Sequence, residues 1–236
     1  MKIALLGSTG LVGKNVLKLL SRLDQVASVY CPVRSVPELT SLGILQGSSK
    51  IDFEVIDFEQ INSVDEANKI RAGFLGCDAV VCCLGTTLKQ AGSKPAQEKV
   101  DLRLPLSLAA MAKKQGVRQF LCVSAQGARK DSPFFYNRLK GMLEEGLTMM
   151  DFECLTLVRP SLLLGKHKDK RFGEELLQKT IGKHPEWIPA HIRPVHAETV
   201  AAHLVASLLR PPKDVVCASD GTGAVYVELF LGCAVV

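Results

Sequence analysis

Short apolar runs alternate with amphipathic stretches along most of this chain. The apolar runs predict strands at Lys2–Leu6, Gln25–Val33, Ile51–Ile56, Asp78–Leu84, Gln119–Ser124 and Glu153–Arg159. The amphipathic stretches predict helices at Leu11–Leu23, Ser63–Phe74, Ala96–Gln115, Ser132 to about Leu147, Phe172–Thr180 and Ala197–Leu209. Such alternation is typical of a parallel sheet covered by helices on both faces. The sequence therefore predicts an α/β fold with a doubly wound parallel sheet of Rossmann type, in which ligands bind at the carboxyl ends of the strands.

Prolines and glycines refine the predicted helices. Pro105 should kink the long helix, and Gly116 should end it at the C′ position. Ser132 should cap the following helix, with Pro133 at its first position. Because no Gly/Ser-rich linker interrupts the chain, we expect one domain over 1–236, in which 165–194 forms a small C-terminal cap over the cleft.

A glycine-rich loop connects the first predicted strand to the first predicted helix. Its residues are Gly7, Ser8, Thr9, Gly10, Leu11, Val12 and Gly13. Gly7 permits a tight turn, Gly10 lets the backbone approach a pyrophosphate, and Gly13 lets the helix pack closely on the strand. The N–H groups at the start of the helix would face the phosphates. This placement predicts a dinucleotide site, and a structural turn without a ligand is the alternative.

The end of the second strand bears on which dinucleotide binds. An NAD enzyme usually carries an acidic residue there, but this strand continues through Val33 into Arg34 without a carboxylate. Arg34 can pair with a 2′-phosphate, so NADP(H) is favoured over NAD(H), with a solvated surface arginine as the alternative. Asp57 should face the adenine, and Gly85 and Thr86 should pass the nicotinamide ribose, although all three also suit ordinary turns.

Three residues form a candidate catalytic group. Tyr136 and Lys140 are four apart on a predicted helix and therefore share one face. An ammonium near a phenol lowers its pKa from about 10, which would let Tyr136 act as a general acid or base near neutral pH. Ser124 ends the preceding strand and could hold the substrate oxygen. A Tyr-x-x-x-Lys pair alone is common and usually carries no function, so its place in the fold is what supports this assignment.

Composition changes this picture little. The 29 basic and 24 acidic residues leave a charge of +5, which weakly favours anionic ligands and does not indicate nucleic acid. The eight cysteines include Cys82, Cys83 and Cys122 in apolar runs, so we expect free buried thiols. The cysteines and histidines show no zinc-type spacing, and no metal site is expected.

The apolar segments also bear on location. Only four apolar residues lie between Lys2 and Gly7, whereas a secretory signal needs about 7–15. The apolar tail Val225–Val236 contains Glu228 and is shorter than the ~20 residues of a membrane span. We therefore expect a cytoplasmic protein without a membrane span.

Taken together, these motifs resemble the short-chain dehydrogenase/reductase superfamily, in particular its atypical branch, similar to Tat-interacting-protein-type oxidoreductases and their bacterial relatives. The segments that carry the resemblance are the glycine loop, Val123–Ala128, Tyr136 with Lys140, Val158–Ser161 and Pro194–His196. The resemblance covers about 1–211 and implies a Rossmann core, NADPH binding and a site made of Ser124, Tyr136 and Lys140.

The chain departs from the superfamily pattern at two places. Many members carry an asparagine on the helix before the fifth strand, whereas Val100–Arg103 contains Asp101 and no asparagine, which puts a proton relay by this route in doubt. The tail after Pro212 matches no pattern of the family, and we interpret it as a last edge strand.

These observations lead to one preferred function and two alternatives. We expect an NADPH-dependent oxidoreductase that transfers a hydride to a small-molecule carbonyl substrate. The alternatives are a dinucleotide-binding regulatory protein and a nucleotide-sugar epimerase-like enzyme; the short C-terminal region disfavours the latter. The substrate is not identified, and a homodimer is left open.

Overall fold

A computed structural model describes residues 1–44, 49–164 and 194–210 and the backbone of the strand at 224–230. The predicted cap at 165–194 falls almost entirely outside the described residues, as does the helix expected at Phe172–Thr180. The part of the chain that carries the glycine loop and the candidate catalytic residues is described throughout.

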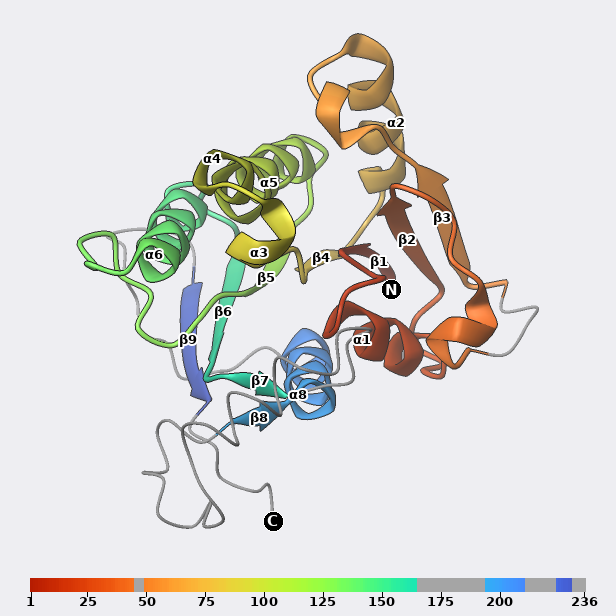
Figure 1. Ribbon diagram of the computed structural model, residues 1–236. Helices are drawn as coiled ribbons and strands as arrows, with labels where there is room; N and C mark the ends of the chain where they lie inside the picture. Colours follow the sequence, from red (N-terminus) through yellow and green to blue (C-terminus); the bar gives the residue numbers. More distant parts are fainter. Residues whose placement is uncertain (45–48, 165–193, 211–223, 231–236) are drawn as a thin grey trace.

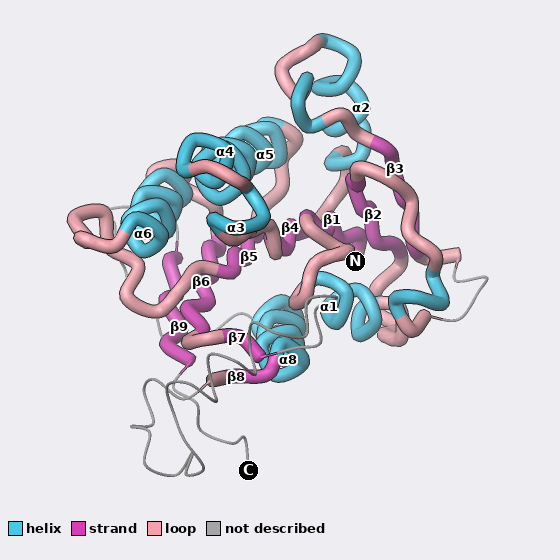
Figure 2. Tube along the Cα trace, viewed as in Figure 1, coloured by secondary structure: helices cyan, strands magenta, loops and turns pink. Residues whose placement is uncertain are grey.

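The centre of the fold is a parallel sheet of seven strands in the order β3-β2-β1-β4-β5-β6-β9 (Figures 1 and 2). The strands are β1 (Lys2–Leu6), β2 (Ser28–Val33), β3 (Ile51–Val55), β4 (Ala79–Cys82), β5 (Gln119–Val123), β6 (Cys154–Pro160) and β9 (Ala224–Phe230). The strand order reverses direction between β1 and β4, which is the switch point where a doubly wound sheet binds its ligand. The predicted fold class is confirmed, and the tail does supply an edge strand, because β9 pairs with β6.

Helices cover both faces of the sheet. α1 (Gly13–Leu20) and α8 (Ala197–Leu209) lie on one face, and α2 (Val64–Phe74), α5 (Leu104–Lys114) and α6 (Phe135–Thr148) lie on the other (Figure 1). The short strands β7 (Leu163–Leu164) and β8 (Val195–His196) pair beside α8. Because the central strands are buried on both faces, their sequences read as continuous apolar runs.

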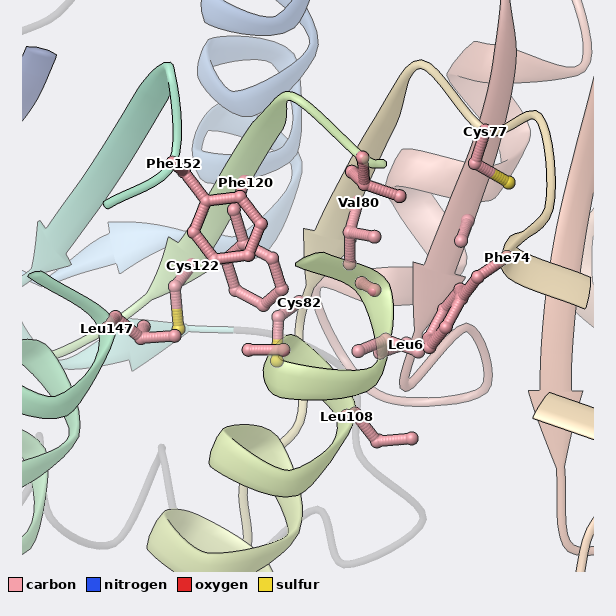
Figure 3. Packing of buried hydrophobic residues seen from close by; sticks show 14 of the residues in the cluster. Leu6, Phe74, Cys77, Val80, Cys82, Leu108, Phe120, Cys122, Leu147 and Phe152 are labelled. Carbon is pink, nitrogen blue, oxygen red and sulfur yellow. The ribbon is translucent and has the colours of Figure 1, made fainter. Parts of the chain in front are cut away.

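Each face of the sheet has its own apolar core. On the α2, α5 and α6 side, Phe120 of β5 packs on Phe152 with ring centroids 5.0 Å apart (Figure 3). Cys82 and Cys122 lie in the same layer as free, buried thiols, as expected. On the other side, α1 and α8 pack against β1, β2 and β4. Packing on both faces holds the sheet in place. The loops at its carboxyl edge therefore begin at well-defined positions.

The long helix expected at Ala96–Gln115 is interrupted. It consists of α4 (Lys94–Glu98), a π-helical turn at Lys99–Arg103, and α5. The predicted kink at Pro105 therefore takes the form of a wide turn just before that residue. The proline ring clashes with the carbonyl four residues earlier, here that of Asp101, and provides no N–H for it. At the other end, Gly116 adopts a φ of +81° after α5, as predicted.

The predicted start of α6 is wrong. Ser132 does not cap the helix: α6 begins at Phe135, its N-cap is Phe134, and that residue makes no side-chain capping bond. The Ser132 hydroxyl instead accepts a hydrogen bond from the Phe134 N–H at 3.3 Å. Pro133 therefore lies in the turn that precedes the helix, and not at its first position. A short helix, α3 (Leu88–Ala91), also follows β4 and was not expected.

Candidate dinucleotide and catalytic site

The glycine loop follows β1 and lies against the end of β4. Gly7 has a φ of +78°, and a Cβ there would lie 2.9 Å from the carbonyl carbon and oxygen of Cys83. A Cβ on Gly13 would lie 2.0 Å from the Gly7 carbonyl oxygen. Both positions therefore require glycine, one for its backbone angle and its contact with β4, the other for the close packing of α1 on the loop.

Gly10 differs from the other two glycines. A Cβ there would meet only the Gly7 oxygen at 3.2 Å and the Cys83 oxygen at 3.9 Å among atoms within 4 Å. The space that a side chain would occupy therefore forms a cradle at the start of α1, where the first N–H groups of a helix lack acceptors within the helix. These residues fit the pyrophosphate of a dinucleotide, which needs close backbone approach and N–H donors.

The two residues expected near the adenosine end lie at the same edge of the sheet. Arg34 directly follows β2 and is exposed. Asp57 lies just beyond β3, where its carboxylate accepts from the Glu59 N–H at 2.9 Å and from the Gln60 amide at 3.3 Å. Its own N–H donates to Glu66 at 2.9 Å. The Asp57 side chain therefore caps a short turn, the alternative that its sequence context left open.

The loop after β4 brings Gly85 and Thr86 next to Asp101. The Thr86 N–H donates to Asp101 Oδ1 at 3.0 Å, and the Gln97 amide donates to the Thr86 carbonyl at 3.4 Å. A Cβ on Gly85 would lie 3.2 Å from Asp101 Oδ1 and 4.0 Å from Lys140 Nζ. Asp101 thus connects two predicted parts of the site. It contacts Thr86, in the loop expected beside the nicotinamide ribose, and Lys140, the expected catalytic lysine.

Lys140 and Asp101 form a buried pair. Lys140 Nζ lies 3.8 Å from Asp101 Oδ1, and the two side chains are 2% and 0% exposed. Lys140 also donates to the Val123 carbonyl at 3.3 Å. Burial lowers the pKa of Lys140. The charges of Tyr136, Cys122 and Asp101 together raise it by more than burial lowers it, so the net pKa lies above the usual value of a lysine. Burial raises the pKa of Asp101, which Lys140 and the Thr86 N–H partly offset.

Tyr136 lies at the exposed side of this pair. Lys140 Nζ is 6.0 Å from the centroid of the tyrosine ring, and Tyr136 is 39% exposed. Burial raises the pKa of Tyr136, whereas the Lys140 charge lowers it, and the net pKa lies above the ordinary value. The expected lowering of the Tyr136 pKa is therefore wrong, because desolvation of the phenol outweighs the charge of the Lys140 ammonium.

Ser124 directly follows β5, one residue beyond the end of the strand, and its hydroxyl is already hydrogen-bonded. Ser124 is 2% exposed, and its Oγ donates to Oε1 of Glu144. Arg159 binds the same carboxylate, with Nε 2.8 Å from Oε1 and Nη2 2.5 Å from Oε2. The structure thus brings Ser124 and Lys140 to adjacent positions at the end of β5, each with a partner of its own.

Gly141 lets α6 pack closely on the loop that follows β5. A Cβ on Gly141 would lie 2.2 Å from the Arg129 carbonyl carbon, so only glycine fits there. Asn137 reaches back, and its amide donates to the Gln126 carbonyl at 2.9 Å. The loop and the helix are held together in this way, which fixes Tyr136 and Lys140 relative to the end of β5.

The sequence interpretation missed several residues of this site. Asp101 was noted only as a missing asparagine, whereas it contacts Thr86 and Lys140. Glu144 was not considered, although it is four residues after Lys140 on the same helix face as Tyr136. That spacing was the signal available in the sequence, because buried charges at successive turns of one face require partners.

Comparison with protein families adds an independent finding. Residues 7–211 match the model of a family described as NAD(P)H-binding. The chain is 32% identical over 215 residues to the mitochondrial protein FMP52 of Meyerozyma guilliermondii, covering 90% of this chain and 88% of that protein. It is 31% identical over 210 residues to HTATIP2 of Rattus norvegicus, covering 89% and 81%.

Solved structures agree on the fold. A putative NAD-dependent epimerase/dehydratase from Bacillus halodurans is 22% identical with a TM-score of 0.61, covering 89% of this chain and 88% of that one. A UDP-glucuronic acid 4-epimerase from Bacillus cereus, in complex with NAD, is 14% identical with a TM-score of 0.66, covering 97% and 77%. At these identities the likeness shows the Rossmann fold alone.

The expected cytoplasmic location is contradicted by the relatives, because the fungal FMP52 proteins are named as mitochondrial. Among the helices that the structure describes, none is long and apolar enough to cross a bilayer. The family match spans the glycine loop, the Tyr136–Lys140 pair and the residues around Arg159. The chain therefore belongs to the NAD(P)H-binding family, which agrees with the resemblance of its motifs to the atypical short-chain dehydrogenases/reductases.

Proposed function

We propose that this protein is an NADP(H)-dependent oxidoreductase that reduces a carbonyl compound. The observation that carries the proposal is the buried Lys140 ammonium beside Tyr136, at the carboxyl edge of the sheet. Burying an ammonium costs several kcal/mol, which an apolar residue at the same place would avoid. A charge kept at that cost, next to a titratable phenol and close to the Gly85–Thr86 loop, is typical of a functional site.

Each residue of the site would have a separate role in the reduction. A bound nicotinamide dinucleotide would supply the hydride for the carbonyl carbon. Tyr136 keeps its proton at neutral pH because burial raises its pKa, and it can therefore donate that proton to the carbonyl oxygen. Lys140 stabilises the phenolate that remains. The glycine loop would bind the pyrophosphate, and Ser124 would contact the substrate beside Tyr136.

Arg34 supports the preference for NADP(H). It lies one residue beyond β2, as Gly7 lies one residue beyond the neighbouring β1, so its guanidinium starts from the edge where the adenosine end of a dinucleotide would lie. A guanidinium can hold a phosphate with two parallel hydrogen bonds. The end of β2 provides no carboxylate that would bind a ribose hydroxyl in its place.

Removal of the Tyr136 hydroxyl tests the reductase directly. Tyr136→Phe keeps the ring and should leave dinucleotide affinity almost unchanged, while turnover of accepted carbonyls should fall by about 10²–10⁴-fold. A suitable panel contains acetophenone, 2-hydroxyacetophenone and cyclohexanone, with NADPH oxidation followed by absorbance. The matched control is Tyr30→Phe, because Tyr30 lies on β2 and its hydroxyl bonds to Glu54 at 2.7 Å.

The same variant separates the enzyme from a dinucleotide-binding regulator. If a cellular output is lost with Gly10→Val but fully kept with Tyr136→Phe, the protein acts by binding the dinucleotide and not by turnover. Loss of the output with both variants supports the reductase. The names of the fungal relatives further support a mitochondrial setting, which a fluorescent fusion of the chain would test.

A further inference from the structure

Asp101 places a buried carboxyl group against both the loop after β4 and helix α6. The Thr86 N–H donates to Asp101 Oδ1 at 3.0 Å, and Lys140 Nζ lies 3.8 Å from the same oxygen. Asp101 Oδ2 has no hydrogen-bond partner among the residues that the structure describes, and the side chain is 0% exposed. A buried carboxylate oxygen without a donor is costly, so the charge of this residue needs an explanation other than packing.

The contacts of Asp101 do not by themselves require a charge. An asparagine has the same shape, and its carbonyl oxygen would accept from the Thr86 N–H equally well. The carboxylate adds a negative charge 3.8 Å from Lys140 Nζ. Because both side chains are at most 2% exposed, water and salt screen this interaction little. The negative charge of Asp101 therefore offsets the positive charge of Lys140 within the site.

This neutralisation acts on the protons of Tyr136 and Lys140. The Tyr136 ring centroid lies 6.0 Å from the same Nζ atom, and an ammonium close to a phenol favours the phenolate. Burial of the phenol and the Asp101 charge oppose this effect, and both raise the pKa of Tyr136. Burial lowers the pKa of Lys140, and Asp101 is among the groups that raise it. Asp101 thus favours the protonated form of both residues.

Three thiols also face Lys140, and they are the other candidates for a balancing negative charge. They belong to Cys82, Cys83 and Cys122. Cys82 and Cys122 pair in register on β4 and β5 and lie in the apolar layer on the α5 and α6 side of the sheet (Figure 3). Burial among apolar side chains disfavours a thiolate, whereas a carboxylic acid ionises far more readily. Asp101 is therefore the preferred source of the negative charge.

We propose that Asp101 is a positioning residue whose charge holds the Tyr136–Lys140 pair in the form that carries both protons. Carbonyl reduction needs one proton for the carbonyl oxygen in addition to the hydride, and this form of the pair supplies it throughout the neutral pH range. Alcohol oxidation releases that proton and needs the form of the pair that has lost one, so it proceeds only at alkaline pH. This inference rests on the proposed reductase function and assigns to Asp101 the pH range of each direction of the reaction.

The first test needs no substrate. Isotope-labelled tyrosine and lysine side chains are titrated by NMR, and the signals of Tyr136 and Lys140 are assigned with Tyr136→Phe and Lys140→Arg. Because the two groups interact, both are followed, and the lower of their two midpoints is compared between variants. Asp101→Asn keeps the shape of the side chain and should move that midpoint down by about one pH unit or more.

The matched control is Asp78→Asn. Asp78 precedes β4 at the opposite edge of the sheet, where its Oδ2 accepts from the Lys2 N–H at 2.8 Å, so its loss should leave both midpoints unchanged. A second measurement uses the wild type alone and does not depend on the folding of Asp101→Asn. The carboxyl carbon of Asp101 should show an ionised group near neutral pH, and a protonated Asp101 at that pH would overturn the inference.

The second test follows both directions of the reaction against pH. The assays measure kcat/KM for reduction of acetophenone with NADPH and for oxidation of 1-phenylethanol with NADP⁺. In Asp101→Asn, the rise of oxidation and the fall of reduction should both move to lower pH by about one pH unit or more, because the pair loses its first proton earlier. Asp78→Asn should keep the wild-type profiles. A loss of kcat/KM by the same factor at every pH would mean that Asp101 is only structural, and would overturn the inference.

The outcomes separate the inference from the proposed function. Unchanged NMR midpoints in a folded Asp101→Asn variant would overturn the inference even in an active enzyme. Midpoints that move in Cys82→Ser but not in Asp101→Asn would also overturn it, because a thiolate would then balance Lys140. If Asp101→Asn moves the midpoints but the whole carbonyl panel is inert, the proposed function fails and the control of reaction direction fails with it, while the effect of Asp101 on the pair stands.

Discussion

The three glycines of the loop should respond differently to the same small change. Alanine at Gly13 places a Cβ 2.0 Å from the Gly7 oxygen, an overlap that only a shift of backbone can relieve. Overpacking of this kind costs about 1–3 kcal/mol and sometimes more. At Gly7 the same change adds a left-handed φ of +78° for an L-residue to a 2.9 Å contact with Cys83. The left-handed conformation alone costs about 1–2 kcal/mol.

Gly10 is the informative exception. Its Cβ would lie 3.2 Å from one carbonyl oxygen, and its φ is not positive, so a few tenths of an ångström of movement suffice. A compatible Gly→Ala change also restricts the unfolded chain by about 0.4–1 kcal/mol. We therefore expect Gly10→Ala to keep the wild-type stability, whereas Gly7→Ala and Gly13→Ala should each lose about 2–4 kcal/mol. Urea unfolding monitored by circular dichroism measures all three.

Gly10→Ala should impair NADPH binding even though it keeps the wild-type stability. Wild-type protein at a hundred times its Kd for NADPH should gain about 2.7 kcal/mol. For a chain of this size that gain corresponds to a rise in Tm of about 5–11 °C. Gly10→Ala should lose most of this rise despite its intact fold, because the methyl group fills the cradle for the pyrophosphate. The reasoning is refuted if Gly10→Ala unfolds as easily as Gly13→Ala, or if it keeps the full NADPH shift.

Three further predictions concern charge and protonation. Arg34→Ala should narrow the difference in binding free energy between NADPH and NADH by about 1.5–3 kcal/mol by calorimetry, whereas Arg22→Ala, an exposed arginine beyond the other end of α1, should not; equal affinities in the wild type would exclude the assignment. Burial raises the pKa of Asp101 above its unfolded value of about 3.9, so its contribution to stability is complete below about pH 4 and is lost as the pH rises through the folded pKa. The unfolding free energy of the wild type should therefore fall relative to Asp101→Asn over that range, and a difference that is independent of pH would contradict it. Burial also raises the pKa of Tyr136, so ultraviolet titration should show a step above about pH 10 that Tyr136→Phe removes; a step below that pH would mean that Lys140 outweighs burial.

The sequence predicted correctly those elements whose signal is local and periodic. The strands, the glycine loop and the end of α5 at Gly116 follow from apolar runs and from backbone angles that glycine alone adopts readily. The start of α6 was mispredicted because Ser132 and Pro133 carry capping chemistry, while the chain uses them in the turn before the helix.

The electrostatics of the site were harder to predict, because they depend on burial. Tyr136 and Lys140 are adjacent as their spacing suggested, but the direction of the tyrosine pKa depends on desolvation, which the spacing does not contain. Asp101, which accepts from the Thr86 N–H, lies in a π-helical turn that the sequence pattern did not predict. The partner of Glu144, Arg159, comes from a strand that the linear sequence does not place beside α6.

The pairing of β9 with β6 has a consequence for how this protein folds. The contact spans every residue from Cys154 to Pro160, yet β9 comes after all other described strands in the sequence. Parallel neighbours of this kind form only after a long loop closes, which makes them slow to assemble. Until β9 arrives, the backbone of β6 presents an open edge that can pair with another chain. Chains caught at that stage should be the ones that aggregate, so the yield of folded protein should depend on how quickly β9 docks on the strand that carries Arg159.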